Sequence, residues 1–199
     1  MMTKSEEGLW RAVVIVAVLN LAYFVVEFSV AEIIGSVSLL ADSIDFLEDA
    51  SMNFLIAVAL GWTVARRAVV GKLLAGILLI PGLATLWMAW QKFSLSVPPE
   101  AIPLSLTGGG ALVVNLSCAL LLTQYRHHAG SLTRAAFLSA RNDALANIAI
   151  IAAGFFTAYT VSAWPDLIVG LGIAVMNADA AREVYTAARD EQKVRSPMA

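Results

Sequence analysis

The chain has 199 residues, of which 59% are hydrophobic and only 14% are charged. Soluble domains are about 25% charged, so this composition excludes a soluble globular protein and indicates an integral membrane protein. The net charge of -2 argues against a nucleic-acid partner, because scattered Lys and Arg residues form no basic surface that could follow a phosphate backbone.

Apolar runs long enough to cross a bilayer, at roughly 20 residues each, recur along the chain. They predict six transmembrane helices, near residues 11–32, 36–64, 69–92, 104–125, 134–160 and 164–186. The first run has no small-residue cleavage site, so we expect a retained helix and not a signal peptide. The prediction is an all-α integral membrane protein with one transmembrane domain, residues 1–199, whose residues 187–199 form a short cytoplasmic tail.

Turn residues or charges separate the predicted helices, as short connections require. The breaks fall at Gly35, from Arg66 to Lys72, at Val97-Pro98-Pro99, from Arg126 to Arg134, and at Trp164-Pro165-Asp166. Basic residues are concentrated in the second, fourth and final connections, which the positive-inside rule assigns to the cytoplasm. We therefore expect cytoplasmic termini and a multi-pass membrane protein, with the bacterial inner membrane as its location.

The glycine run Gly108-Gly109-Gly110 lies in the predicted fourth helix. Two interpretations stay open, because glycines let membrane helices approach closely and also weaken the start of a helix. The single cysteine, Cys118, lies in an apolar run and is expected to be a buried thiol.

The second predicted helix carries acids at helical spacing. Asp42, Asp45, Asp49 and Asn53 recur at i, i+3, i+7 and i+11. At roughly 100° per residue they form a stripe about 80° wide on a helix that is apolar elsewhere. An Asp at the centre of a membrane helix costs roughly 2.5 to 3.5 kcal/mol on insertion scales. A chain that keeps several must recover this free energy through a partner or a ligand.

The fifth predicted helix carries a second polar stripe, formed by Ser139, Asp143 and Asn147. The two helices run in opposite directions, so Asp49 and Asp143 should face each other near the middle of the bilayer. A divalent cation relieves both the repulsion between such carboxylates and the cost of their desolvation. One oxygen ligand on the preceding turn of each helix, Asp45 and Ser139, completes a four-ligand site. The absence of His and Cys favours Mn²⁺, Fe²⁺ or Mg²⁺.

Residues 35–50, GSVSLLADSIDFLEDA, resemble the second helix of the cation diffusion facilitator family. The family signature in this helix is His or Asp followed four residues later by Asp, and here it reads Asp45-x-x-x-Asp49. The family's fifth helix carries a second such pair, at positions that match Ser139 and Asp143.

The resemblance implies a secondary transporter and not an enzyme. Members of the family export divalent metals from the cytoplasm in exchange for protons, so the implied partners are a divalent metal ion, protons, the lipid bilayer and a second copy of the chain in a homodimer. The expected cargo is Zn²⁺, Mn²⁺ or Fe²⁺, with no resident cofactor. The family's cytoplasmic C-terminal domain is expected to be missing from this short form.

The same resemblance implies metal ligands at Asp45, Asp49 and Asp143. Ser139 stands where the family has His or Asp, so the fourth ligand would be weak or would come from water, Asn142 or Asn147. Asp42 is either a ligand or a structural or entry residue. Asn53 and Asn147 are expected mainly as interhelical hydrogen-bond partners.

Other polar residues remain open to two interpretations. Glu27 shares a face of the first helix with Asn20, and it either lines an access path or lies at the outer interface. His127 and His128 either capture cytoplasmic metal or are simply solvated. Arg141 should point away from the site, toward the cytoplasm.

Three alternatives to metal export also stay open. The acids would form an interhelical ion pair or share a proton if the site held no ligand. A proton-coupled organic-cation exporter would need an aromatic cage beside the acids, for which the second helix offers Phe46 and Phe54. A non-transporting membrane subunit would use the acids only for assembly.

Overall fold

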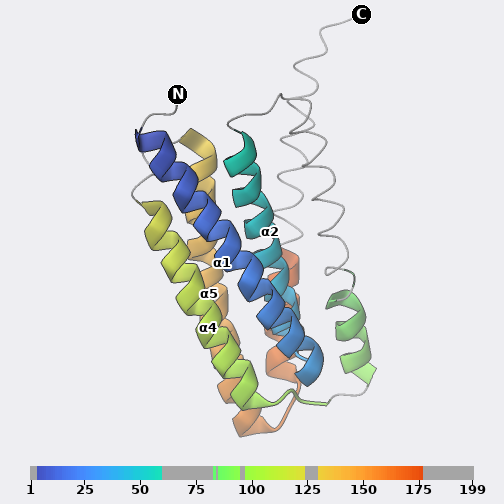
Figure 1. The fold of residues 1–199 in the computed structure, drawn as a ribbon. Coiled ribbons are helices and arrows are strands. Elements are labelled where there is room, and N and C mark those ends of the chain that lie inside the picture. The colour runs from blue at the N-terminus through green and yellow to red at the C-terminus, as the bar shows by residue number, and fades with distance from the viewer. Residues whose placement is uncertain (1–3, 60–82, 84, 95–96, 124–129, 177–199) are drawn as a thin grey trace, which may run out of the picture.

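The computed structural model describes residues 4–59, 83, 85–94, 97–123 and 130–176, and these residues are helical apart from short connections. The principal helices are α1 (Lys4–Ile34), α2 (Val37–Ala59), α4 (Ala101–Thr123) and α5 (Gly130–Thr160) (Figure 1). Further helical segments span 85–94 and Trp164–Met176. The predicted all-α class is confirmed, since no strand occurs in the described part of the chain.

Three described stretches are long and apolar enough to cross a membrane, namely Glu7–Ile34, Ala101–Thr123 and Asn142–Thr160. Helix α2 has 23 residues but carries the four acids of the sequence DSIDFLED. The predicted helices at 69–92 and 164–186 lie only partly within the described residues. Six crossings and cytoplasmic termini therefore stay predictions.

Three helices begin earlier than their apolar runs predict. Helix α1 starts at Lys4, α4 at Ala101 and α5 at Gly130, so the predicted break that ends at Arg134 falls partly inside α5. Hydropathy marks the apolar part of a helix, whereas its hydrogen bonds continue into polar sequence. The polar start of α1 carries an ion pair between residues one helical turn apart, with Arg11 Nη2 at 2.6 Å from Glu7 Oε1.

The connection between α1 and α2 is a tight turn at Gly35, as predicted. Gly35 has a φ of 63°, a left-handed conformation that glycine adopts without a steric penalty. Ser36 N donates to Ala31 O at 2.9 Å, the bond of a Schellman cap, and Ser36 Oγ accepts from Leu39 N at 3.2 Å as the N-cap of α2. One residue ends the first helix and the next begins the second, so α1 and α2 lie antiparallel side by side (Figure 1).

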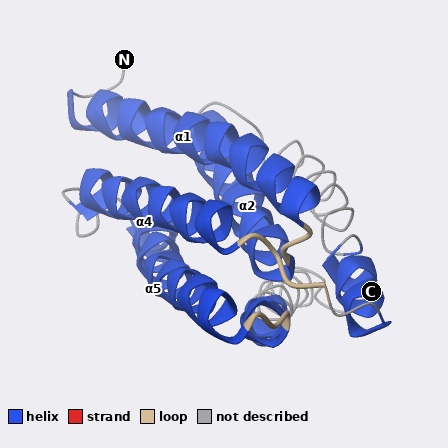
Figure 2. Cartoon of the chain, turned by 90° about the horizontal axis from the view of Figure 1, so that it is seen from below, coloured by secondary structure: helices blue, strands red, loops and turns tan. Residues whose placement is uncertain are grey.

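The four principal helices form a bundle in which each contacts two main neighbours. Helix α1 packs against α2 and α4, and α5 packs against the same two helices from the other side (Figure 2). Helices α2 and α5, which carry the predicted polar stripes, are therefore direct neighbours.

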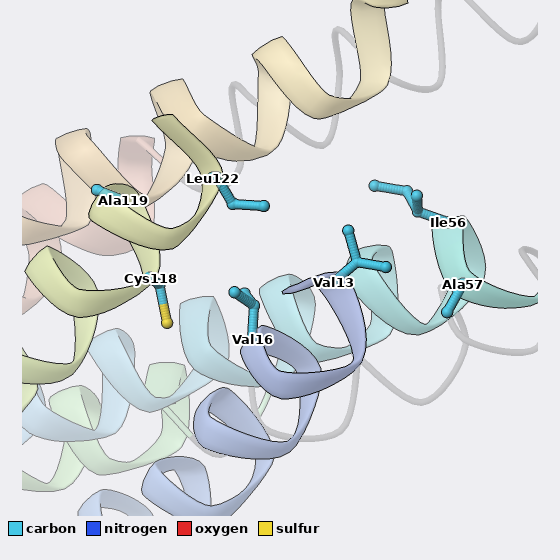
Figure 3. Packing of buried hydrophobic residues seen from close by; sticks show 7 residues of the cluster. All are labelled: Val13, Val16, Ile56, Ala57, Cys118, Ala119 and Leu122. Carbon is cyan, nitrogen blue, oxygen red and sulfur yellow. The ribbon is translucent and has the colours of Figure 1, made fainter. Parts of the chain in front are cut away.

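Two apolar clusters lie at different levels of this bundle. The first joins the N-terminal half of α1 to the ends of α2 and α4, through Val13, Val16, Ile56, Ala57, Cys118, Ala119 and Leu122 (Figure 3). The second lies near the Gly35 turn and includes Ala31, Leu39, Leu40, Ala41, Leu104, Ile150 and Ile173. Between these clusters, α1, α2 and α4 each carry a stretch of buried polar residues.

The glycine run in α4 serves close packing. A side chain at Gly110 would collide with the hydroxyl of Tyr23 on α1, and one at Gly108 would meet Ile150 Cγ2 at 2.9 Å. The Tyr23 hydroxyl donates to Thr107 O at 2.7 Å. Because α4 is helical from Ala101 onward, the alternative of a frayed helix start is wrong.

Candidate functional site

A layer of buried polar side chains lies between the two apolar clusters. Its members come from all four principal helices and are Asn20 and Glu27 on α1, Asp42, Asp49 and Asn53 on α2, Asn115 on α4, and Asn147 on α5, each 3% exposed or less. Buried polar groups in a membrane bundle carry a large desolvation cost and usually mark function. We refer to these seven residues as the polar layer.

The acids of the predicted stripe on α2 differ in burial. Asp42 and Asp49 are buried, whereas Asp45 is half-buried. Asn53 is also buried, and its Nδ2 donates to Asp49 O at 2.9 Å within the same helix. The expected interhelical role of Asn53 has no support here, because the partner of its amide lies on its own helix.

Helix α5 brings a further carboxyl to the same level. Asp143 is half-buried, and its carboxyl lies close enough to that of Asp49 to interact directly with it. Asp45 is close enough to Asp143 for their charges to interact. The structure thus brings together the three acids that the sequence suggested as metal ligands.

The remaining candidates are placed differently. Asn142 is exposed, beside the half-buried Asp143. The side chains of Ser139 and Arg141 lie outside the described residues, as do His127 and His128. Within the described ranges, no group of three or more His, Cys, Asp or Glu side chains has the geometry of a metal site. The three acids supply a cluster of oxygen donors, and a cation would have to draw them closer together.

Asp42 has a partner on α5. Asn147 Nδ2 donates to Asp42 Oδ2 at 2.5 Å, and Asn147 Oδ1 accepts from Asn115 Nδ2 at 3.1 Å. This chain of hydrogen bonds crosses from α4 through α5 to α2. The predicted role of Asn147 as an interhelical hydrogen-bond partner is confirmed.

Glu27 is a member of the site that the sequence did not identify as one. It is 0% exposed, and its carboxyl lies close enough to that of Asp42 to interact with it directly. Its position along the membrane normal, at an access path or at the outer interface, stays a prediction. One signal in the sequence would have revealed its contact with Asp42. Glu27 and Asp42 stand at nearly equal distances along the chain on either side of Gly35, so a tight antiparallel hairpin brings them to the same level.

Two other contacts border the polar layer. The rings of Tyr23 and Phe46 lie 5.0 Å apart between centroids, which joins α1 to α2 beside the acids. The buried Cys118 is a free thiol, as expected, and its Sγ lies 3.9 Å from Asn20 Oδ1. Phe54, the second aromatic residue considered for a cage, is 50% exposed and does not face the site.

A separate polar junction holds the N-terminus of α2. The carboxylate of Asp166, at the start of the Trp164–Met176 helix, accepts hydrogen bonds from Ser36 Oγ at 2.6 Å and from Val37 N at 2.9 Å. Lys92 Nζ approaches the same carboxylate at 3.5 Å. Three segments far apart in the sequence therefore meet at one buried acid.

A sequence model of the cation efflux transmembrane domain matches residues 13–190. The match covers most of the chain and includes every residue of the polar layer. No curated protein matches the chain.

Proposed function

The chain belongs to the cation efflux family, and on this premise we propose that it is a secondary transporter that exports a divalent metal ion from the cytoplasm in exchange for protons. The observation that carries the proposal is the meeting of Asp45, Asp49 and Asp143 from two neighbouring helices, inside a bundle that is apolar on both sides of them.

The proposed ligands of the transported ion are Asp45, Asp49 and Asp143, with Ser139 as a fourth. Asp42 is left out because the Asn147 amide already binds it. Three carboxylates supply more negative charge than a divalent ion carries, so the cation would relieve their mutual repulsion. An all-oxygen set suits Mn²⁺ and Fe²⁺, and Zn²⁺ remains a candidate cargo through its affinity for carboxylates.

Exchange with protons follows from the chemistry of these ligands. A carboxylate must lose its proton to bind a metal ion, so metal and protons compete for the same oxygens. Alternating access would come from rocking of α2 against α5, with the cation near the middle of the membrane. In this proposal the working unit is a homodimer in the lipid bilayer, and the direction of transport requires cytoplasmic termini.

The test is reconstitution of the purified protein in liposomes with a pH gradient. Uptake of Mn²⁺, Fe²⁺, Zn²⁺, Co²⁺ and Cd²⁺ would be compared between the wild type and Asp49→Ala. We expect at least one of these ions to move in the wild type and none to move in the variant. If the wild type moves no ion, or if the variant moves it equally well, the proposal fails.

The same liposomes separate this function from its alternatives. An organic-cation exporter would respond to a lipophilic cation and not to the metals. For a non-transporting subunit, Asp49→Asn would leave function intact while it disrupted association with a partner.

A further inference from the structure

Glu27 and Asp42 form a carboxyl pair outside the proposed set of metal ligands. Both side chains are fully buried, and their carboxyls lie close enough to interact directly. No described residue supplies a hydrogen-bond donor to either carboxyl oxygen of Glu27 or to Oδ1 of Asp42. These oxygens of the two acids, which meet between α1 and α2, therefore lack a donor from any other described residue.

An ionised carboxylate only accepts hydrogen bonds, so two ionised carboxylates cannot form one between them. A proton on one of the two would therefore supply the donor that these buried oxygens lack. Without it, two negative charges in contact would lose their hydration and repel each other. A single bound proton removes one charge and supplies the missing donor.

The surrounding hydrogen bonds assign this proton to Glu27. Asn147 Nδ2 donates to Asp42 Oδ2, and Asn147 is itself held by Asn115. A hydrogen bond donated to a carboxylate favours its ionised form. Asp42 is therefore the acceptor of the pair, and Glu27 is the acid that donates to it.

The titratable groups around the pair connect it to the metal ligands. Tyr23 on α1, Asp45 on α2 and Asp143 on α5 lie within electrostatic range of Glu27 or Asp42. On α4 the titratable neighbour in the described part of the chain is Cys118, whose own electrostatic neighbours are Asp49 and Asp143. A divalent cation between the ligands would make the local potential less negative and would favour release of the proton. By linkage, departure of the cation favours its return.

We propose that Glu27 and Asp42 form a proton-binding site distinct from the metal ligands, and that its proton is exchanged for the transported cation together with those displaced from the ligand carboxylates. The exchange of this proton for the cation rests on the proposed function, whereas the existence of the proton-binding site does not. One proton is taken up by Glu27 as the cation leaves and is given up to water as the next cation binds.

The first test needs no transport. In the purified, metal-free chain, infrared difference spectra between acidic and alkaline buffers should contain the carbonyl stretch of a protonated carboxyl. The part of this band that belongs to Glu27 should be lost in Glu27→Gln and kept in the matched variant Glu32→Gln, which removes an exposed acid from the same helix. Asp42→Asn should move the pH midpoint of the band, because it removes the charge that faces Glu27.

The second test measures coupling in liposomes. A pH gradient should accelerate cation uptake by the wild type and by Glu32→Gln, and this acceleration should be smaller in Glu27→Gln, whose cation binding is followed separately by calorimetry. Gln keeps the shape of Glu and can donate to Asp42, so size-exclusion profiles should match. If Glu27→Gln does not fold, the pH midpoint of the carbonyl band in Asp42→Asn tests whether the pair binds a proton. An unchanged midpoint would overturn the proton site.

Each outcome has one meaning. A spectrum of Glu27→Gln identical to that of the wild type overturns the proton site. Loss of the Glu27 part of the band together with normal acceleration by the pH gradient overturns its role in exchange. A wild type that moves no cation contradicts the proposed function, and the infrared band alone then decides whether the pair holds a proton.

Discussion

Asp166 binds Ser38 through both the side chain and the backbone of the serine. Asp166 Oδ1 accepts from Ser38 Oγ at 2.6 Å and from Ser38 N at 3.2 Å. An acid on the last described helix therefore caps the N-terminus of α2, where the unpaired N–H groups and the helix dipole favour negative charge. Helix α2, which carries most of the acids of the site, is held in place from outside the four-helix bundle.

Removal of this cap should destabilise the protein. Asp166→Ala leaves Lys92 without its buried partner and several N–H and hydroxyl groups without an acceptor, so we expect a loss of about 3–5 kcal/mol in the free energy of unfolding. Unfolding in mixed micelles, followed by circular dichroism, measures it. Asp166→Asn keeps an acceptor oxygen and should lose less. Equal losses in the two variants would mean that the charge contributes all of the stabilisation.

The close approach of the Trp164–Met176 helix to α2 gives a second prediction. A Cβ at Gly170 would lie 2.7 Å from Ser38 N and from Val37 C. Both are backbone atoms, so no change of side-chain rotamer can relieve the clash. Gly170→Ala should therefore separate the two helices and cost roughly 1–3 kcal/mol, the usual penalty of overpacking. Gly172→Ala is the control, because nothing lies within 4 Å of the added carbon. The measurement is the midpoint temperature of thermal unfolding of both variants in detergent. Similar midpoints for Gly170→Ala and Gly172→Ala would contradict so close an approach of the two helices.

Metal affinity should depend on Asp143. Asp143→Asn keeps the volume of the side chain but removes one of three clustered charges, so we expect affinity for the transported ion to fall by more than the roughly 10–100-fold that loss of an outer partner costs. Isothermal titration of the purified protein measures the change. Glu100→Gln, which neutralises an exposed acid before α4, should bind as the wild type does. A normal affinity in Asp143→Asn would remove Asp143 from the ligand set.

Selectivity should depend on Ser139. Imidazole suits Zn²⁺ better than a hydroxyl does, so Ser139→His should shift the preference of the transporter toward Zn²⁺ over Mn²⁺. Competition between the two ions for uptake into liposomes measures this ratio. An unchanged ratio would show that the side chain at position 139 does not bind the ion.

Helical spacing alone anticipated much of the candidate site. The period of the α-helix placed Asp45 and Asp49 on one face of α2, and the antiparallel order of the helices brought Asp143 to the level of Asp49, with which it is in contact. Both inferences depend only on local geometry and chain direction, which the sequence contains. The ligand roles of these acids stay predictions.

The contact of Glu27 with Asp42 was missed because periodicity within one helix gives no register between two helices. That register is set by the two-residue cap at Gly35 and Ser36 and by side-chain packing such as that of Tyr23 against Phe46. The junction at Asp166 was missed for a similar reason. It joins segments far apart in the chain, and no spacing in the sequence relates Asp166 to Ser38.

The shortness of the Gly35 turn also bears on how the protein enters the membrane during its synthesis. Helix α1 contains a stretch of mean hydropathy 2.3, whereas the acids of α2 each oppose insertion by roughly 2.5 to 3.5 kcal/mol near the helix centre. Only Gly35 and Ser36 separate the two helices, so we expect α2 to enter the membrane together with α1, as one hairpin. Glu27 and Asp42 would then meet before the rest of the chain is made, and a lengthened turn would impair biogenesis before it impaired transport.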